Sequence, residues 1–163
     1  MEWIELEELG EVLSGYAFKS KMYVNKGVRI IRITNVQNGY LEDDEPKYYS
    51  KEDIKGLERY LLLENDILIS LTGNVGRVAK LDKGFLPAAL NQRVACVRAN
   101  KRISYEYLYY MLNSNYFENR CISQSKGVAQ KNLGITNLKK IKIPVPPMET
   151  QEKIVQVLDQ AQA

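Results

Sequence analysis

Hydrophobic and polar residues alternate over residues 141–145, and this period of two predicts a strand with one buried face. Prolines at positions 144, 146 and 147 end the strand, because proline lacks an N–H group and fixes φ. Beyond them, hydrophobic residues recur at helical spacing up to residue 163, which predicts an amphipathic packing helix. We expect its apolar stripe to contain Ile154, Val155, Leu158 and Ala161, and its outward face to contain Gln151, Lys153 and Gln156.

Apolar runs upstream, several of them rich in β-branched residues, predict further strands over residues 29–36, 67–72, 77–81 and 91–98. Turn signals follow the first two of these strands, at Asn38–Gly39 and at the paired glycines of residues 73–76. Two helices are predicted behind the N-caps Ser50 and Ser104, over residues 51–60 and 105–120. An acidic loop over residues 42–46 and a polar loop over residues 123–132 separate these elements.

These elements predict an α+β fold class. We expect a mixed twisted β-sheet with a few short helices, followed by the start of a C-terminal helix that can form a coiled coil. A chain of 163 residues is long enough for one domain with a sizeable core. We place the boundary between that domain, residues 1–147, and the C-terminal helix, residues 148–163. Because the apolar stripe continues to the last residue, we expect this helix to be cut short or to pack against a partner.

Charge is distributed unevenly along the chain. Residues 1–66 contain 9 Lys and Arg against 14 Asp and Glu, whereas residues 67–163 contain 14 against 6, so a net charge of −5 is followed by +8. The segment 70–142 alone holds 13 basic and 3 acidic residues. This asymmetry indicates a face for a polyanion, and a solvated basic surface is the alternative interpretation.

The composition also excludes several classes of protein. No apolar run approaches the ~20 residues of a membrane-spanning helix, and the acidic start of the chain is unlike a signal peptide. Cys96 and Cys121 lack CxxC spacing, so we expect buried thiols and a cytoplasmic location. The chain contains no histidine, which removes the commonest general base and the commonest zinc ligand.

Local motifs do not assemble a catalytic site. Pro146–Pro147 lies between Val145 and Met148, without the amide or acid and the aromatic ring with which amino-methyltransferases hold a flipped base. The loop Gly73-x-x-Gly76 opens a strand and lacks a Gly-Lys-Ser/Thr ending, so it is neither a dinucleotide loop nor a P-loop. The acidic run 42–44 resembles a nuclease metal cluster, but we interpret it as a solvated loop. We predict no catalytic residue and no metal ligand.

Polar loops instead supply side chains that can contact nucleic acid. Glycines in residues 72–77 allow close backbone approach, and an arginine there can bind a phosphate or guanine O6 and N7. Amides in residues 123–132 can pair with adenine, while lysines there reach phosphate or guanine. The predicted contact residues are Tyr16, Lys19, Thr72, Asn74, Arg77, Asn91, Gln92, Lys126, Gln130 and Lys131. A plain hairpin turn, a flexible surface loop, and structural amides at Asn91 and Gln92 remain the alternatives.

The order of these features is more specific than any one of them. The informative segments are residues 3–12, 14–18, 30–39, 65–77, 90–93, 108–112, 126–127 and 143–154. In this order and spacing they resemble one target-recognition domain of the specificity subunit of type I restriction–modification systems, over nearly the whole chain. The resemblance implies that residues 1–147 are a DNA target-recognition domain. Residues 148–163 would then begin the family's conserved spacer and dimerisation helix.

The resemblance further implies a function and partners. Such subunits carry two recognition domains, and each reads one half of a bipartite double-stranded DNA target. They hold modification subunits, which bind S-adenosylmethionine and methylate adenine, and a restriction subunit can add ATP-driven translocation and cleavage. The specificity subunit itself is not an enzyme and needs no cofactor. One recognition domain and a helix of about 18 Å over residues 152–163 indicate a fragment, or a half-subunit that associates with a copy of itself.

Other functions remain open from the residues alone. The Gly73-x-x-Gly76 loop beside Arg77 suggests an RNA-binding module, but a KH domain places that loop between two helices. A protein-assembly module that reads no DNA is the second alternative, in which the basic charge is incidental. Catalysis by a fused partner region is a third.

Overall fold

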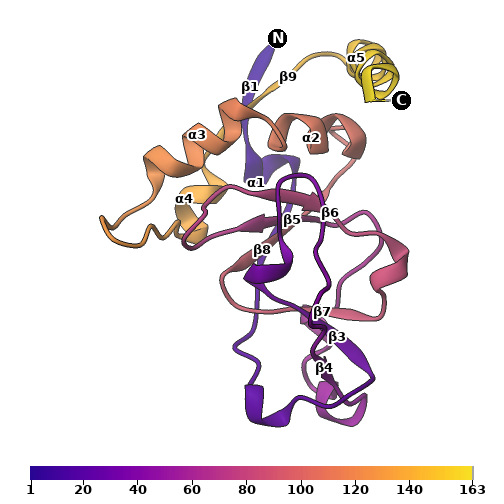
Figure 1. Ribbon diagram of the computed structural model, residues 1–163. Coiled ribbons are helices and arrows are strands. Elements are labelled where there is room, and N and C mark those ends of the chain that lie inside the picture. Colours follow the sequence, from indigo (N-terminus) through magenta and orange to yellow (C-terminus); the bar gives the residue numbers. More distant parts are fainter. Residues whose placement is uncertain (163) are drawn as a thin grey trace.

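A four-stranded antiparallel sheet with the order β2–β8–β5–β6 forms the centre of the molecule in the computed structural model, which describes residues 1–162 (Figure 1). Its strands, in that order, are Gly10–Ser14, Val94–Ala99, Ile67–Ser70 and Val78–Lys80. All four residues of β5 are buried. Ile67 and Ile69 belong to one hydrophobic cluster and Leu68 to another, because alternate side chains of a strand face opposite sides of the sheet.

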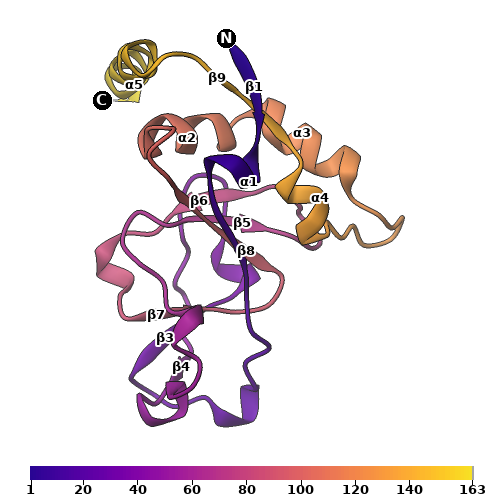
Figure 2. The same ribbon diagram turned by 180° about the vertical axis from the view of Figure 1, so that it is seen from behind.

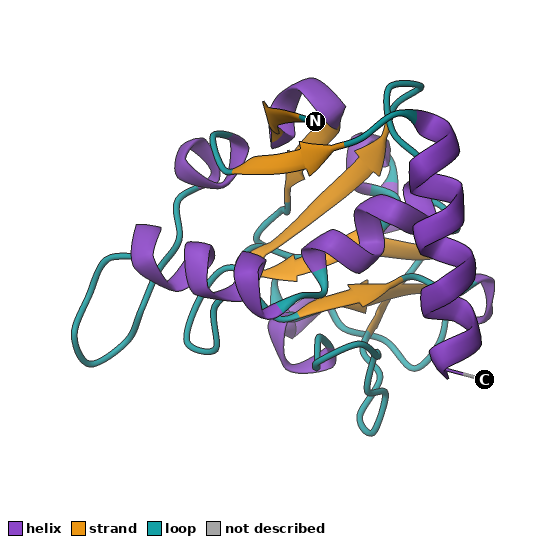
Figure 3. Ribbon diagram, turned by 90° about the horizontal axis from the view of Figure 1, so that it is seen from above, coloured by secondary structure: helices purple, strands orange, loops and turns teal. Residues whose placement is uncertain are grey.

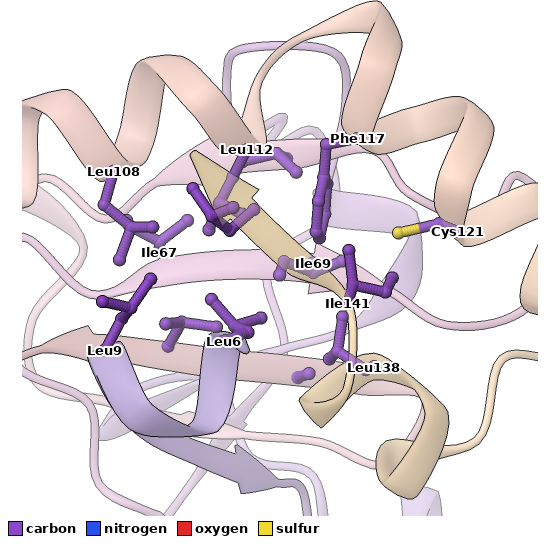
Figure 4. Packing of buried hydrophobic residues seen from close by; sticks show 14 of the residues in the cluster. Leu6, Leu9, Ile67, Ile69, Leu108, Leu112, Phe117, Cys121, Leu138 and Ile141 are labelled. Carbon is purple, nitrogen blue, oxygen red and sulfur yellow. The ribbon is translucent and has the colours of Figure 1, made fainter. Parts of the chain in front are cut away.

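Helices cover one face of this sheet. They are α1 (Leu6–Leu9), α2 (Tyr105–Leu112), α3 (Asn115–Gln124) and α4 (Ile135–Lys139). Figure 4 shows Leu108, Leu112 and Phe117 pointing from α2 and α3 towards Ile67 and Ile69 of the sheet. The fully buried side chains of this layer make it the larger core of the domain.

The single helix predicted over residues 105–120 is wrong, because the chain forms two helices there. Ser104 caps the first as predicted, its hydroxyl accepting a hydrogen bond from the Tyr107 N–H at 3.2 Å. The second begins after Ser114, whose hydroxyl accepts from the Phe117 N–H at 3.2 Å. A serine that can satisfy the first free N–H groups of a helix makes a new start there favourable.

A smaller three-stranded sheet, in the order β4–β3–β7, lies beyond the other face (Figures 1 and 2). Its strands are Tyr48–Tyr49, Val28–Ile31 and Ala88–Leu90. β3 pairs antiparallel with β4 and parallel with β7. The mixed sheets, few helices and C-terminal helix confirm the predicted α+β class.

Three predicted elements are wrong in their extent. The strand over residues 29–36 ends at Ile31, because a 3-10 turn over Ile33–Asn35 follows it. The strand predicted over residues 91–98 begins only at Val94, as β8, because a turn in which Arg93 has φ 71° lies between it and β7. The helix over residues 51–60 is two 3-10 turns separated by Gly56 with φ 87°.

The two ends of the chain meet in a two-stranded ribbon. β1 (Glu2–Glu5) pairs antiparallel with β9 (Lys142–Val145), and Ile4 lies opposite Ile143. Ile141 and Ile143 are buried and Val145 is partly buried, in agreement with the strand predicted there. Helix α5 (Met148–Gln162) follows, beside the N-terminus and in contact with α2 (Figures 1 and 3).

The outward position predicted for Gln151 is wrong. Its side chain is 1% exposed, and its amide accepts a hydrogen bond from the Ser104 N–H and donates one to the Pro146 carbonyl, both at 2.9 Å. Ile154, Val155 and Leu158 are partly buried. The functional division into residues 1–147 and 148–163 stays a prediction, and Ala163 lies outside the described residues.

Cys96 and Cys121 are buried free thiols, as predicted. Burial raises the pKa of both, and that of Cys121 to about 12. Within residues 1–162, no helix is long and apolar enough to cross a bilayer, and His, Cys, Asp and Glu form no cluster of three that could hold a metal.

Candidate nucleic-acid interface

An open groove of about 410 Å³ lies where β5 ends and β6 begins. Four segments that are distant in the sequence contribute to it: residues 33–42, 70–77, the turn at residue 93, and the loop at residue 130. The lining residues are Ile33, Thr34, Val36, Gln37, Glu42, Ser70, Thr72, Gly73, Asn74, Arg77, Arg93 and Gln130. Four of the ten predicted contact residues, Thr72, Asn74, Arg77 and Gln130, are thus brought together in one groove.

Ser70 holds the loop between β5 and β6 in shape. Its buried hydroxyl donates to the Asn74 carbonyl at 2.5 Å and accepts from the Arg77 N–H at 2.9 Å. Gly73 and Gly76 have φ of 70° and 86°, backbone conformations that residues other than glycine rarely adopt. The backbone bonds of the loop therefore leave the side chain of Asn74 exposed at the groove.

Asn35 holds the segment of residues 33–42, which forms the opposite wall of the groove, in shape. Its side chain is 6% exposed, accepts a hydrogen bond from the Arg32 N–H and donates one to the Glu42 carbonyl, both at 2.7 Å. The Glu42 N–H donates in turn to the Asn35 carbonyl at 2.8 Å. These bonds close the segment on itself and present Thr34 and Gln37 to the groove.

A chain of hydrogen bonds crosses the groove between the two walls. The Arg77 Nη1 donates to the Gln37 Oε1 at 3.0 Å, and the Gln37 Nε2 donates to the Thr34 carbonyl at 3.0 Å. The second bond requires the amide of Gln37 to present its oxygen to Arg77. The guanidinium is therefore oriented before any ligand is bound.

The loop after α3 is attached to the same site. Lys126 and Asn132 exchange two backbone hydrogen bonds, of 2.9 and 2.8 Å, which make a small hairpin. The Thr72 hydroxyl donates to the Asn132 Oδ1 at 3.0 Å, and the Lys131 carbonyl accepts from the Gly73 N–H at 2.9 Å. Thr72 is 7% exposed and supports this hairpin, while the side chains of Lys126, Gln130 and Lys131 are exposed.

The remaining four predicted residues lie outside the groove. Tyr16 packs its ring against Phe18, 4.9 Å between centroids, in the smaller aromatic cluster. The Asn91 Oδ1 accepts from the Phe18 N–H at 3.2 Å, so the structure supports the structural-amide alternative for this residue. Lys19 and Gln92 are exposed, and the structure does not bring them into the groove.

The groove also contains residues that the motifs did not single out. Arg93, Gln37, Thr34 and Glu42 line it, and none was predicted as a contact. Arg93 directly follows the predicted pair Asn91–Gln92, and this position next to two predicted contacts is the one feature of the sequence that could have identified it. Its φ of 71° is rare for a residue other than glycine, and such backbone conformations are concentrated at functional sites.

Charge at the groove is predominantly positive. Two guanidinium groups, of Arg77 and Arg93, line it against one carboxylate, of Glu42. The exposed ammonium groups of Lys126 and Lys131 belong to the adjacent hairpin. Hydroxyl and amide groups complete the lining, a combination that can hydrogen-bond both to phosphate oxygens and to base edges.

Comparison with known proteins places this arrangement in a family. A family model described as "Type I restriction modification DNA specificity domain" matches residues 1–163. The chain belongs to this family of specificity domains. The resemblance noted in the sequence is thereby confirmed.

Two curated relatives of the specificity domain come from Escherichia coli. The chain is 32% identical to the type I restriction enzyme EcoAI specificity subunit over 165 residues, which cover 98% of the chain and 28% of that subunit. It is 30% identical to the EcoBI specificity subunit over 144 residues, covering 84% of the chain and 29% of the relative. The chain thus spans less than a third of the length of these two relatives.

Solved structures share the fold of this specificity domain. The HsdS subunit from Thermoanaerobacter tengcongensis superposes with a TM-score of 0.71 at 23% identity, over 99% of the chain and 37% of that subunit. A type I restriction-modification S subunit from M. genitalium gives 0.67 at 16% identity, over 98% and 38%.

Proposed function

We propose that this specificity domain reads one half of a bipartite double-stranded DNA target. The observation that carries the proposal is the groove, in which four segments converge on two arginines and a set of amide and hydroxyl groups. Family membership supports it, since the matching family model is a DNA specificity domain. In this proposal, exposed lysines and Arg93 contact phosphates and set the register, while the groove side chains meet base edges.

The chemistry of modification is assigned to other subunits. We infer that a modification subunit, which binds S-adenosylmethionine and methylates adenine, associates with the protein, and that a restriction subunit that uses ATP can join them. The names of the EcoAI and EcoBI relatives, specificity subunits of type I restriction enzymes, support this division of labour. The chain itself then contributes recognition and no catalytic residue, and α5 offers a helix through which subunits or copies can associate.

The local structure disfavours the RNA-binding alternative. The loop Gly73-x-x-Gly76 joins strands β5 and β6, whereas a KH loop lies between two helices. A pure assembly role would leave the convergence of polar side chains in the groove unexplained. An RNA-binding module should bind single-stranded RNA, and an assembly module should bind no nucleic acid, so binding measurements distinguish the two alternatives.

The test is a genome-wide map of N6-methyladenine in host cells with and without the gene that carries this chain. Loss of one bipartite adenine-methylated motif on deletion is the expected result. An unchanged map, with the modification subunit present and active, would contradict DNA reading. Binding of the purified gene product to duplex DNA and to single-stranded RNA, at several salt concentrations, then identifies which of the two alternatives replaces it.

A further inference from the structure

Two arginines line the groove, and the protein holds them differently. Arg77 is partly buried and bonded to Gln37 across the groove. Arg93 is exposed, and within residues 1–162 its side chain makes no hydrogen bond or ion pair. A guanidinium held by a hydrogen bond and an exposed one without a partner in residues 1–162 suit different parts of a DNA duplex, so the contrast bears on what each one contacts.

The fixed side chain has a defined free edge. Gln37 engages the Nη1 of Arg77, and the backbone N–H of Arg77 is tied to the Ser70 hydroxyl at 2.9 Å. No partner within residues 1–162 takes the edge formed by Nε and Nη2. This edge carries two parallel N–H groups in a rigid plane, the geometry that two adjacent acceptors can meet at once.

Guanine is the base that offers such acceptors. In the major groove its N7 and O6 lie side by side, whereas adenine pairs an acceptor with a donor and thymine presents one acceptor and a methyl group. A phosphate also accepts two hydrogen bonds, but it is reached equally well by an exposed, flexible arginine or lysine. Orientation before binding is useful for a base contact, since it lowers the entropy lost when the contact forms.

We propose that Arg77, oriented by Gln37, reads a guanine in the half-site through its Nε and Nη2 edge, and that Gln37 is the positioning residue for this specificity. The proposal rests on the proposed function and deepens it. Arg93 serves as a phosphate contact. The recognised half-site therefore contains a G·C pair whose identity depends on residues 37 and 77 together.

The experiment selects bound duplexes from a randomised library with the full gene product that carries this chain, purified with the subunits that accompany it. Arg77→Ala is expected to lower preference for one G·C pair by about 5- to 150-fold and to leave other positions unchanged. Arg93→Ala, the matched control, is expected to weaken binding to all sequences and to lower the salt slope by about 1.

Variants of Gln37 test positioning separately from folding. Gln37→Ala is expected to relax the same position as Arg77→Ala, with an unchanged thermal unfolding midpoint. Gln37→Glu keeps an acceptor for Arg77 and is expected to retain the guanine preference. If the unaltered protein selects no half-site, the proposed function fails. If it selects one and Arg77→Ala preserves preference at every position, or Gln37→Ala leaves the position unrelaxed, the inference fails and DNA reading stands.

Discussion

The side-chain amide of Gln151 joins helix α5 to the N-cap of helix α2. Its Oε1 accepts from the Ser104 N–H at 2.9 Å, and its Nε2 donates to the Pro146 carbonyl at 2.9 Å. Because the amide is buried, water cannot replace either bond. The first turn of α5 is therefore packed against the preceding residues and is not a solvated extension.

Replacement of Gln151 by alanine should destabilise the protein. Two backbone groups lose their partners, and each buried unsatisfied group costs about 1–3 kcal/mol. Chemical denaturation monitored by circular dichroism should show a lower midpoint for Gln151→Ala. Gln156→Ala, at an exposed position of the same helix, is the control and should stay within about 0.5 kcal/mol. Equal midpoints for the two variants would contradict the structural role of this amide.

Removing the carboxylate of Asp66 should be among the more damaging single changes. Both its oxygens bond the Arg98 guanidinium, at 2.9 and 3.1 Å, and this hydrogen bonding raises the pKa of Arg98. The side chain of Asp66 is 3% exposed and that of Arg98 23%. Asp66→Ala leaves a half-buried charge unpaired, for which we expect about 3 kcal/mol of lost stability. Glu52→Ala breaks an exposed pair with Lys55 and should cost under about 1 kcal/mol in the same denaturation experiment.

The two glycines of the groove loop allow a steric effect to be isolated. Both have positive φ, but a Cβ at position 73 would meet nothing within 4 Å, whereas one at position 76 would lie 3.0 Å from the Cβ of Cys121. Gly73→Ala should cost about 1–2 kcal/mol through backbone strain alone. Gly76→Ala should cost more, because helix α3 must shift as well. Thermal unfolding of the two variants measures the difference, and equal losses would show that α3 does not press on the loop.

The hydroxyl of Tyr110 should lose its proton at a higher pH than an ordinary tyrosine. Its hydroxyl donates to the Asp159 carboxylate of α5, and this hydrogen bond raises the pKa of Tyr110 to about 12. An unfolded tyrosine titrates near pH 10, so the stability from this bond is complete below about pH 10 and is lost as the pH rises to about 12. An NMR titration of the Tyr110 ring carbons checks the value. Asp159→Asn should lower the pKa towards 10, and an unchanged titration would exclude the bond in solution.

Sequence patterns correctly predicted those elements that depend on residues close together in the chain. The alternation over residues 141–145, the turn at residues 73–76 and the Ser104 cap depend on neighbours within a few positions, and all three are observed. The extents that were wrong depend on a competing local signal, such as the second cap at Ser114 or the αL conformation of Arg93. The helix predicted over residues 105–120 was interpreted as continuous although Ser114 favoured a break, and the strand predicted over residues 91–98 was started before the turn at Arg93.

Long-range contacts could not be predicted in the same way. Gln151 is polar and lies at the start of an amphipathic helix, and its burial depends on a contact with Ser104, 47 residues away, that no local pattern reveals. Gln37 and Arg77 are 40 residues apart and meet because two loops face each other. The residue types of the loops predicted candidate contacts, but the pairing of their side chains required the three-dimensional structure.

Different residues of the groove support the fold and line the surface, and this separation affects which substitutions the protein tolerates. Its walls are held by Ser70 and Asn35, which point into the domain, whereas Thr34, Asn74 and Gln130 at the surface bear little of the folding energy. Substitutions among the exposed side chains can therefore accumulate while the chain still folds. Under the proposed function, a new target preference is then accessible by single point mutations, without an intermediate that fails to fold.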